Sequence, residues 1–263
     1  AVASGTLPSG KTVVVNADGT VTVVAGSDPS VGSPTSFNGN LSWISATFDS
    51  TANKVVVAYQ DRANSYYGTA LVGTVSGTSI SFGSKTVFES AQTEEISAVY
   101  DAANNKTVIA YKDSGNSDYG TAIVGTVSGT SISFGSATVF ESANTTNISA
   151  GYDSANSKTV ISYRDVGNSE YGTAIVGTVS GSSISFGSAA VFVSAVAGNI
   201  STGYDSNSNK IVVSYRNGSD SNAYAIVGTV SGTSISFGTA VSFSSNGEDT
   251  KIAFDSNSNK IVT

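Results

Sequence analysis

Short runs of β-branched and aromatic residues, separated by turn-forming residues, recur along most of the chain. In one well-defined copy the runs are 148–152, 158–163, 173–179 and 183–192. The segments between them, 153–157, 166–169 and 180–182, are made of Asp, Asn, Ser, Gly and other small residues that favour tight turns. No segment has the period of a helix. The pattern therefore predicts an all-β chain of short strands and tight turns.

The same runs return with a period of 52 residues, as shown by Tyr59, Tyr111, Tyr163 and Tyr215. The string Gly-Thr-Val-Ser-Gly recurs with them, beginning at Gly73, Gly125, Gly177 and Gly228. An aromatic residue marks the strand that follows in each copy, at Phe82, Phe134, Phe186 and Phe237. Four strands in a unit of this length are typical of one blade of a β-propeller.

We therefore predict a single all-β domain over residues 1–263, a five-bladed β-propeller with four-stranded blades of about 52 residues. Blades one to four take residues 43–88, 95–140, 147–192 and 199–243. The fifth blade combines residues 250–263, which repeat the first two strands, with residues 11–37, which contain a hairpin. Sharing that blade between the two ends of the chain would close the ring and remove two unpaired sheet edges.

Composition excludes several kinds of chemistry. The chain has no Cys, His or Met, so we expect no thiol nucleophile, no Ser-His-Asp triad and no Cys/His metal centre. We predict no cofactor. A formal net charge of −7 and a pI near 4.4 make nucleic acid a poor partner, because its phosphates would be repelled. No apolar run approaches the ~20 residues of a membrane span, so we predict no membrane insertion.

Sequence variation concentrates on one expected face of the propeller. The copies match closely in their strands but diverge in the connections 89–95, 141–147, 193–199 and 244–249. Loops on a rigid scaffold commonly carry recognition, although neutral drift would also give divergence. Because the divergence is one-sided, we favour recognition.

The first candidate site is a ring of residues just before the innermost strands, at the mouth of the expected channel. It consists of Trp43, Glu95, Asn147, Asn199 and Asp249. The indole could stack on a pyranose ring while the carboxylates and amides bind hydroxyl groups. The alternative is a set of solvated loop ends with Trp43 as an apolar plug. For Trp43 both interpretations stay open, and for the two amides the loop-end interpretation is favoured.

The second candidate site is a set of cations and tyrosines repeated in the turn after the second strand. The cations are Arg62, Lys112, Arg164 and Arg216, and the tyrosines are Tyr67, Tyr119 and Tyr171. A shallow glycan site on every blade would use them. A structural salt bridge between neighbouring turns explains them better, because requirements of the fold repeat in every blade.

An aspartate recurs at the end of the first strand, as Asp49, Asp101, Asp153, Asp205 and Asp255. A calcium loop would need alternating acidic ligands, and here a lysine follows instead. We therefore predict Asx-type turns and no metal site. Catalysis by the non-repeated acids Glu94, Glu95, Glu248 and Asp249 is a further alternative, as in glycoside hydrolases. The innermost strands carry no other acid, and we predict that the chain is not an enzyme.

The motifs Thr159-Val-Ile-Ser-Tyr-Arg-Asp165, Gly167-Asn-Ser-Glu-Tyr171 and Ser183-Ile-Ser-Phe-Gly187 resemble the repeats of tail fibre and adhesin-like proteins of marine bacteriophages. The resemblance implies an extracellular or virion-surface adhesin module, part of a larger oligomeric fibre or surface assembly. Its expected partner is a cell-surface glycan or host receptor. A structural spacer is the alternative from another class, and a carboxylate-dependent glycoside hydrolase is the second alternative.

Overall fold

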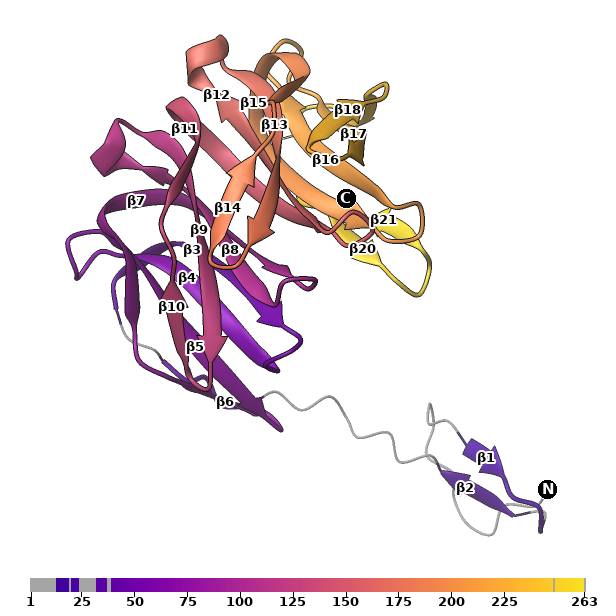
Figure 1. Cartoon of the computed structure of the whole chain (residues 1–263). Helices are drawn as coiled ribbons and strands as arrows, with labels where there is room; N and C mark the ends of the chain where they lie inside the picture. Colours follow the sequence, from indigo (N-terminus) through magenta and orange to yellow (C-terminus); the bar gives the residue numbers. More distant parts are fainter. Residues whose placement is uncertain (1–12, 19, 24–31, 37–38, 248, 263) are drawn as a thin grey trace. The chain divides into compact units, whose positions relative to one another are not determined.

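A computed structural model describes residues 13–18, 20–23, 32–36, 39–247 and 249–262 (Figure 1). The chain divides into two compact units, residues 1–35 with 76–79 and residues 36–75 with 80–263. In the first unit β1 (Val13–Val15) pairs antiparallel with β2 (Val21–Val23). Asp18 accepts a hydrogen bond from the Thr20 amide (2.9 Å), which closes the turn between the two strands.

The second unit repeats one pattern of strands. It begins with β3 (Leu41–Asp49), β4 (Lys54–Asp61), β5 (Tyr67–Ser76) and β6 (Ser79–Phe82). The next repeat has β7 (Thr86–Asp101), β8 (Lys106–Asp113), β9 (Tyr119–Ser128) and β10 (Ser131–Phe134). The third has β11 (Thr138–Asp153), β12 (Lys158–Asp165), β13 (Tyr171–Ser180) and β14 (Ser183–Phe186).

The fourth repeat has β15 (Ala190–Asp205), β16 (Lys210–Asn217), β17 (Ala223–Ser231), β18 (Ser234–Phe237) and β19 (Val241–Ser244). A last hairpin pairs β20 (Ala253–Asp255) with β21 (Lys260–Val262). Single 3₁₀ turns, η1 (Ser114–Asn116) and η2 (Val166–Asn168), follow β8 and β12. The all-β class and the repeat are thus confirmed. Across the described part of the chain, no helix is long and apolar enough to span a membrane.

The predicted five-bladed propeller is wrong, because strand pairing does not stop between repeats. The connection 89–95, taken as a loop in the sequence, lies inside the 16-residue strand β7. The first part of β7 pairs with β5 and its second part pairs with β8. β11 and β15 continue the pairing in the same way. The result is one large antiparallel sheet from β3 to β19 in place of separate blades.

The shared fifth blade is also wrong. β1 pairs with β2 and β20 pairs with β21, and among the described residues no register joins one hairpin to the other. Local hairpins need only short loops, so each end of the chain satisfies its backbone without the other. Residues 34–36 are not a strand, and residues 11, 12, 24–31 and 37 of the expected blade lie outside the described residues.

The core lies between successive repeats and fixes their spacing. Val56, Ala58 and Val72 of the first repeat pack with Ile109 and Tyr111 of the second. The central strands are buried along most of their length, which explains their continuous Val, Ile and Ala content. An aromatic contact between the first and second strands of a repeat recurs along the chain, as in Phe140 of β11 with Tyr163 of β12, whose ring centroids are 5.2 Å apart. The repeats therefore form a packed scaffold.

The recurring aspartates form the predicted Asx-type turns. Each accepts hydrogen bonds from backbone amides two or three residues further on, as when Asn156 N donates to Asp153 Oδ1 (3.0 Å). Asn156 Nδ2 donates to the other oxygen of Asp153 at 2.8 Å. Asp153 is completely buried, whereas the bonds of Asp205 are exposed.

We expect Asp153→Ala to lower the free energy of unfolding by about 2 kcal/mol, because it removes the buried carboxylate that accepts both hydrogen bonds from Asn156. Asp205→Ala removes the same kind of turn in water and should cost less than about 1 kcal/mol. Urea denaturation of both variants measures the difference. Equal losses would contradict a role for burial.

Candidate functional site

A β-bulge interrupts the first strand of every repeat at the same place. In β3, Ser42 pairs with Gln60 and Ser45 pairs with Ala58, so Trp43 and Ile44 together face one residue of β4. The same register shift lies at 94/97 in β7, 146/149 in β11 and 198/201 in β15. A bulge redirects side chains away from the regular alternation of a strand. The first bulge residues of the four repeats are Trp43, Glu95, Asn147 and Asn199.

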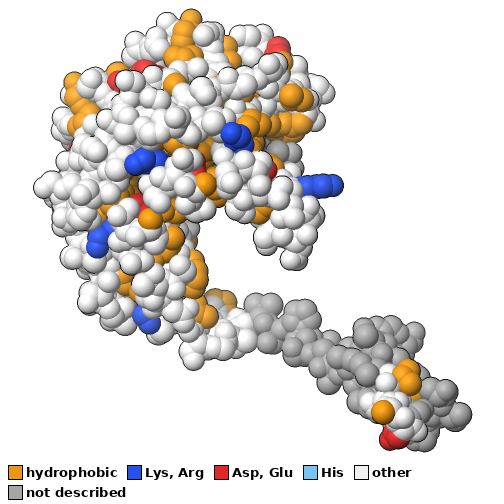
Figure 2. Space-filling model, turned by 45° about the vertical axis from the view of Figure 1, so that its right-hand side comes forward, with side chains coloured by type: hydrophobic (Ala, Val, Ile, Leu, Met, Phe, Trp, Pro, Cys, Tyr) orange, Lys and Arg blue, Asp and Glu red, His pale blue; other side chains and the backbone are white. Residues whose placement is uncertain are grey.

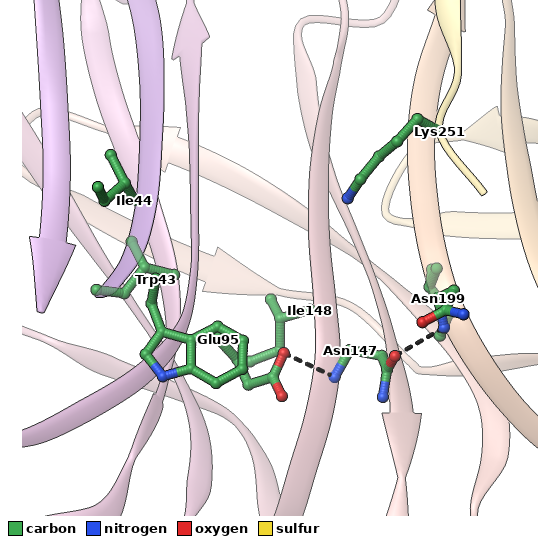
Figure 3. A pocket seen from close by; sticks show the side chains of 9 residues that line it. Trp43, Ile44, Glu95, Asn147, Ile148, Asn199 and Lys251 are labelled. Atoms are coloured by element: carbon green, nitrogen blue, oxygen red, sulfur yellow. Dashed lines mark hydrogen bonds between the residues drawn. The ribbon is translucent and has the colours of Figure 1, made fainter. Parts of the chain in front are cut away.

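These four bulge residues line a single cavity of about 280 Å³ (Figure 3). The isoleucine that follows each of them, at 44, 96, 148 and 200, supplies the apolar part of the wall, and Lys251 completes it. The structure thus brings together four of the five residues predicted as a ring. The fifth, Asp249, is exposed and is not among the lining residues.

Hydrogen bonds connect the pocket residues of successive repeats. Asn147 N donates to Glu95 Oε2 at 3.1 Å, and Asn199 N donates to Asn147 Oδ1 at 2.7 Å (Figure 3). Within the described residues, Glu95 Oε1 accepts no hydrogen bond from a neighbour. Glu95 Oε2 therefore links β7 to β11, while Glu95 Oε1 can accept a hydrogen bond from a ligand.

Burial raises the pKa of Glu95, because the pocket wall removes water from its charged form. The Asn147 amide, Lys112 and Arg164 act in the opposite direction, and the negative charge of Glu94 adds to the increase. Glu95 is therefore protonated at higher pH than an exposed glutamate would be.

The backbone at the bulge is left-handed. The φ angles of Trp43, Glu95, Asn147 and Asn199 lie between 49° and 54°. Asn adopts this conformation readily, whereas for most other residues it costs about 1–2 kcal/mol. Trp43 and Glu95 therefore occupy positions that the backbone alone would give to Asn. We take this as an indication that their side chains have a role besides folding.

We expect Glu95→Asn to raise the free energy of unfolding by about 0.5–1 kcal/mol, because Asn relieves the left-handed backbone. Its side chain can also accept the Asn147 amide bond, as Asn147 does for Asn199. Thermal unfolding at neutral pH measures the effect. Asn147→Ala, which loses both advantages, should unfold at lower temperature, and a destabilised Glu95→Asn would contradict the strain argument.

The repeated cations contact the residue before each bulge or the adjacent turn. Lys112 Nζ lies 2.7 Å from Glu94 Oε2, and Arg164 Nε donates to Thr146 Oγ1 at 2.8 Å. Arg62 Nε donates to Ser42 Oγ at 3.1 Å, and Arg216 Nη2 donates to Ser221 Oγ at 2.8 Å. Three of these contacts hold the residue before a bulge, and the contact of Arg216 lies within the turn that follows its own strand.

The aspartates beside the cations make other bonds. Asp113 caps η1 by accepting from the amides of Gly115 and Asn116, and Asp61 pairs with Lys85 Nζ at 2.9 Å. The half-buried tyrosines are the first residues of β5, β9 and β13, namely Tyr67, Tyr119 and Tyr171. A glycan site at these turns stays a prediction.

Sequence reasoning missed Lys251. Alignment on the recurring aspartates places it in a column of serines, Ser45, Ser97, Ser149 and Ser201. Each of these hydroxyls accepts an amide from the next repeat, as in Ala98 N to Ser45 Oγ at 2.9 Å. A lysine cannot accept that bond. The replacement of the recurring serine by lysine is therefore the feature of the sequence that could have identified Lys251 as a pocket residue.

Of the acids considered for catalysis, Glu95 lines the pocket. Glu94 pairs with Lys112, Asp249 is exposed and Glu248 lies outside the described residues. In the described part of the chain, no group of three or more acidic side chains could hold a metal ion. On the face drawn in Figure 2, Lys and Arg side chains stand singly. Neither a scan against protein-family models nor a search of curated proteins gives a match.

Proposed function

We propose that this chain is a non-catalytic glycan-binding module displayed on a cell or virion surface. The observation that carries the proposal is the convergence of one bulge position from four repeats on a single pocket. That pocket offers an indole, a carboxylate, two amides and an ammonium group. An aromatic ring packs on the apolar face of a sugar, and the polar groups exchange hydrogen bonds with its hydroxyls.

The size of the pocket suits one sugar residue. Its volume of about 280 Å³ lies at the lower end of the range of small-molecule sites. The pocket is also built on strands held by the packed core between repeats, so its polar groups are pre-positioned. The expected ligand is therefore the terminal residue of a glycan.

A binding role fits the polar groups better than hydrolysis does. Glycoside hydrolases use two carboxyl groups about 5–9.5 Å apart on either side of the scissile bond. Among the described residues that line this pocket, Glu95 is the single carboxylate. Its amide bond to the next repeat also occupies one of its two oxygens.

A glycan-array screen of the intact chain, repeated with a calcium chelator, tests the proposal. We expect reproducible binding to one class of terminal sugar, unchanged by the chelator, because no metal site is needed. Trp43→Ala should weaken that binding, whereas Phe48→Ala, made on the same strand away from the pocket lining, should not. A silent array would favour a structural spacer or a protein receptor and would overturn the glycan proposal.

A further inference from the structure

The charges inside the pocket narrow the class of sugar. Resting on the glycan-binding proposal, we infer that the pocket takes a terminal hexuronic acid, whose carboxylate pairs with Lys251 while its ring packs on Trp43. The remaining hydroxyls of the sugar face Glu95 and the amides of Asn147 and Asn199. The inference stands on the placement of one cation and one carboxylate on different parts of the same pocket wall (Figure 3).

Lys251 supplies the anion-binding group. Its side chain extends into the pocket from the segment before β20, whereas Trp43 and Glu95 come from β3 and β7 (Figure 3). In the described residues Lys251 forms no ion pair, with Glu95 or with any other acid. The repeat would place serine here, so the lysine is not required by the packing between repeats. A ligand carboxylate would give this charge its partner.

A cationic or neutral sugar fits less well. The ammonium group of an amino sugar would be repelled by Lys251, while Glu95, the one carboxylate that could pair with it, already accepts the Asn147 amide and loses its charge at higher pH than an ordinary glutamate. A neutral sugar would leave the lysine without an ionic partner. An acidic sugar matches Lys251 and still offers hydroxyl donors to Glu95 Oε1, the oxygen that no described neighbour occupies.

Glu95 gives the binding a pH dependence. Because its pKa is raised, Glu95 takes up a proton at higher pH than an ordinary glutamate, and protonation removes its repulsion of a ligand carboxylate. The charged groups that act on Glu95 are Glu94, Lys112 and Arg164. Burial would raise the pKa of Glu94, but its hydrogen bond with Lys112 outweighs burial and lowers it. Burial would likewise lower the pKa of Lys112, but the negative charges of Glu94, Asp118 and Glu95 raise it. The pKa of Glu94 is thus lowered while that of Glu95 is raised, so Glu94 and Lys112 stay charged while Glu95 takes up its proton.

Titration calorimetry with four monosaccharide probes tests the inference. The probes are the methyl glycosides of glucuronic acid and galacturonic acid and their neutral counterparts, methyl glucoside and methyl galactoside. We expect one uronide to bind at least about tenfold more tightly than its neutral counterpart, as a charge-assisted bond requires. Lys251→Gln should remove that preference and leave the affinity for the neutral sugar within about twofold.

Lys106→Gln is the matched control, because it removes the same charge at the start of β8, away from the pocket lining. It should leave the preference for the uronide intact. Lowering the pH from 7.5 to about 5 should strengthen uronide binding severalfold, and Glu95→Gln should abolish this change. Methyl glycosides without a carboxylate should show a weaker dependence.

The outcomes separate the two proposals. If neutral and acidic glycosides bind equally, or if Lys251→Gln does not alter the preference, the acidic-sugar inference fails while glycan binding stands. If an amino sugar on the array binds more tightly than any uronide, the inference also fails. If none of the probes binds and the array is silent, both the inference and the proposed function are overturned.

Discussion

Replacing Trp43 with alanine should raise the dissociation constant for the array-selected glycan by at least about thirtyfold, or about 2 kcal/mol. The indole is the largest apolar surface in the pocket, and Trp43 is 44% exposed. Stacking a sugar on it removes that surface from water, and alanine offers no comparable area. Calorimetry measures the loss.

Phe48→Ala is the matched control for this variant. Phe48 is also an exposed aromatic residue of β3, at 53%, but it does not line the pocket. Its removal should leave the affinity within about twofold. Retained affinity in Trp43→Ala, or an equal loss in both variants, would show that the ligand binds elsewhere.

The largest expected effect on stability is that of Gly120→Ala, which should lower the free energy of unfolding by about 3 kcal/mol. A Cβ at this position would lie 2.4 Å from Phe140 Cε2 and 2.7 Å from Cζ. Phe140 of β11 is buried and packs against Tyr163 of β12, so its ring cannot move away from β9 without disturbing that contact. Chemical denaturation monitored by circular dichroism gives the difference.

Gly198→Ala provides the comparison, because no heavy atom lies within 4 Å of the Cβ that it would add. Its effect should stay within about 0.5 kcal/mol. If Gly120→Ala unfolds at the same denaturant concentration as the unaltered chain, the packing of Phe140 against β9 is looser than these contacts imply.

Much of the fold follows from the sequence because its signals are local. Strand content, the 52-residue period and the Asx-type turns depend on residues that are neighbours in the chain. The turn residues Asp153 and Asp205, for example, act on amides only two or three residues away. Such features can be predicted without knowing how the repeats pack.

The arrangement of the repeats could not be predicted in the same way. Segment 89–95 contains Ser, Ala, Gln and Thr, a composition that suits a loop as well as an edge of a strand. Its hydrogen bonds to β5 and β8 decide that it is strand, and those partners are distant in sequence. The propeller prediction failed at these connections and at the two terminal hairpins.

The candidate site was predicted in part. Trp43, Glu95, Asn147 and Asn199 share one column of the repeat, so their convergence follows from the period. Asp249 falls in the same column when the last copy is aligned on Asp255, but it is exposed and does not line the cavity. Lys251 completes the cavity wall instead. The left-handed backbone that marks Trp43 and Glu95 as unusual has no signature in a single strand sequence.

Fluorescence of Trp43 during titration with the array-selected glycan tests the central claim most directly. The chain contains one tryptophan, so its emission reports on this pocket without labelling. We expect a saturable blue shift with one site per chain, at the same dissociation constant as that found by calorimetry, because the sugar displaces water from the indole. Binding that calorimetry detects while the emission of Trp43 stays unchanged would contradict a glycan site formed by the bulges of successive repeats.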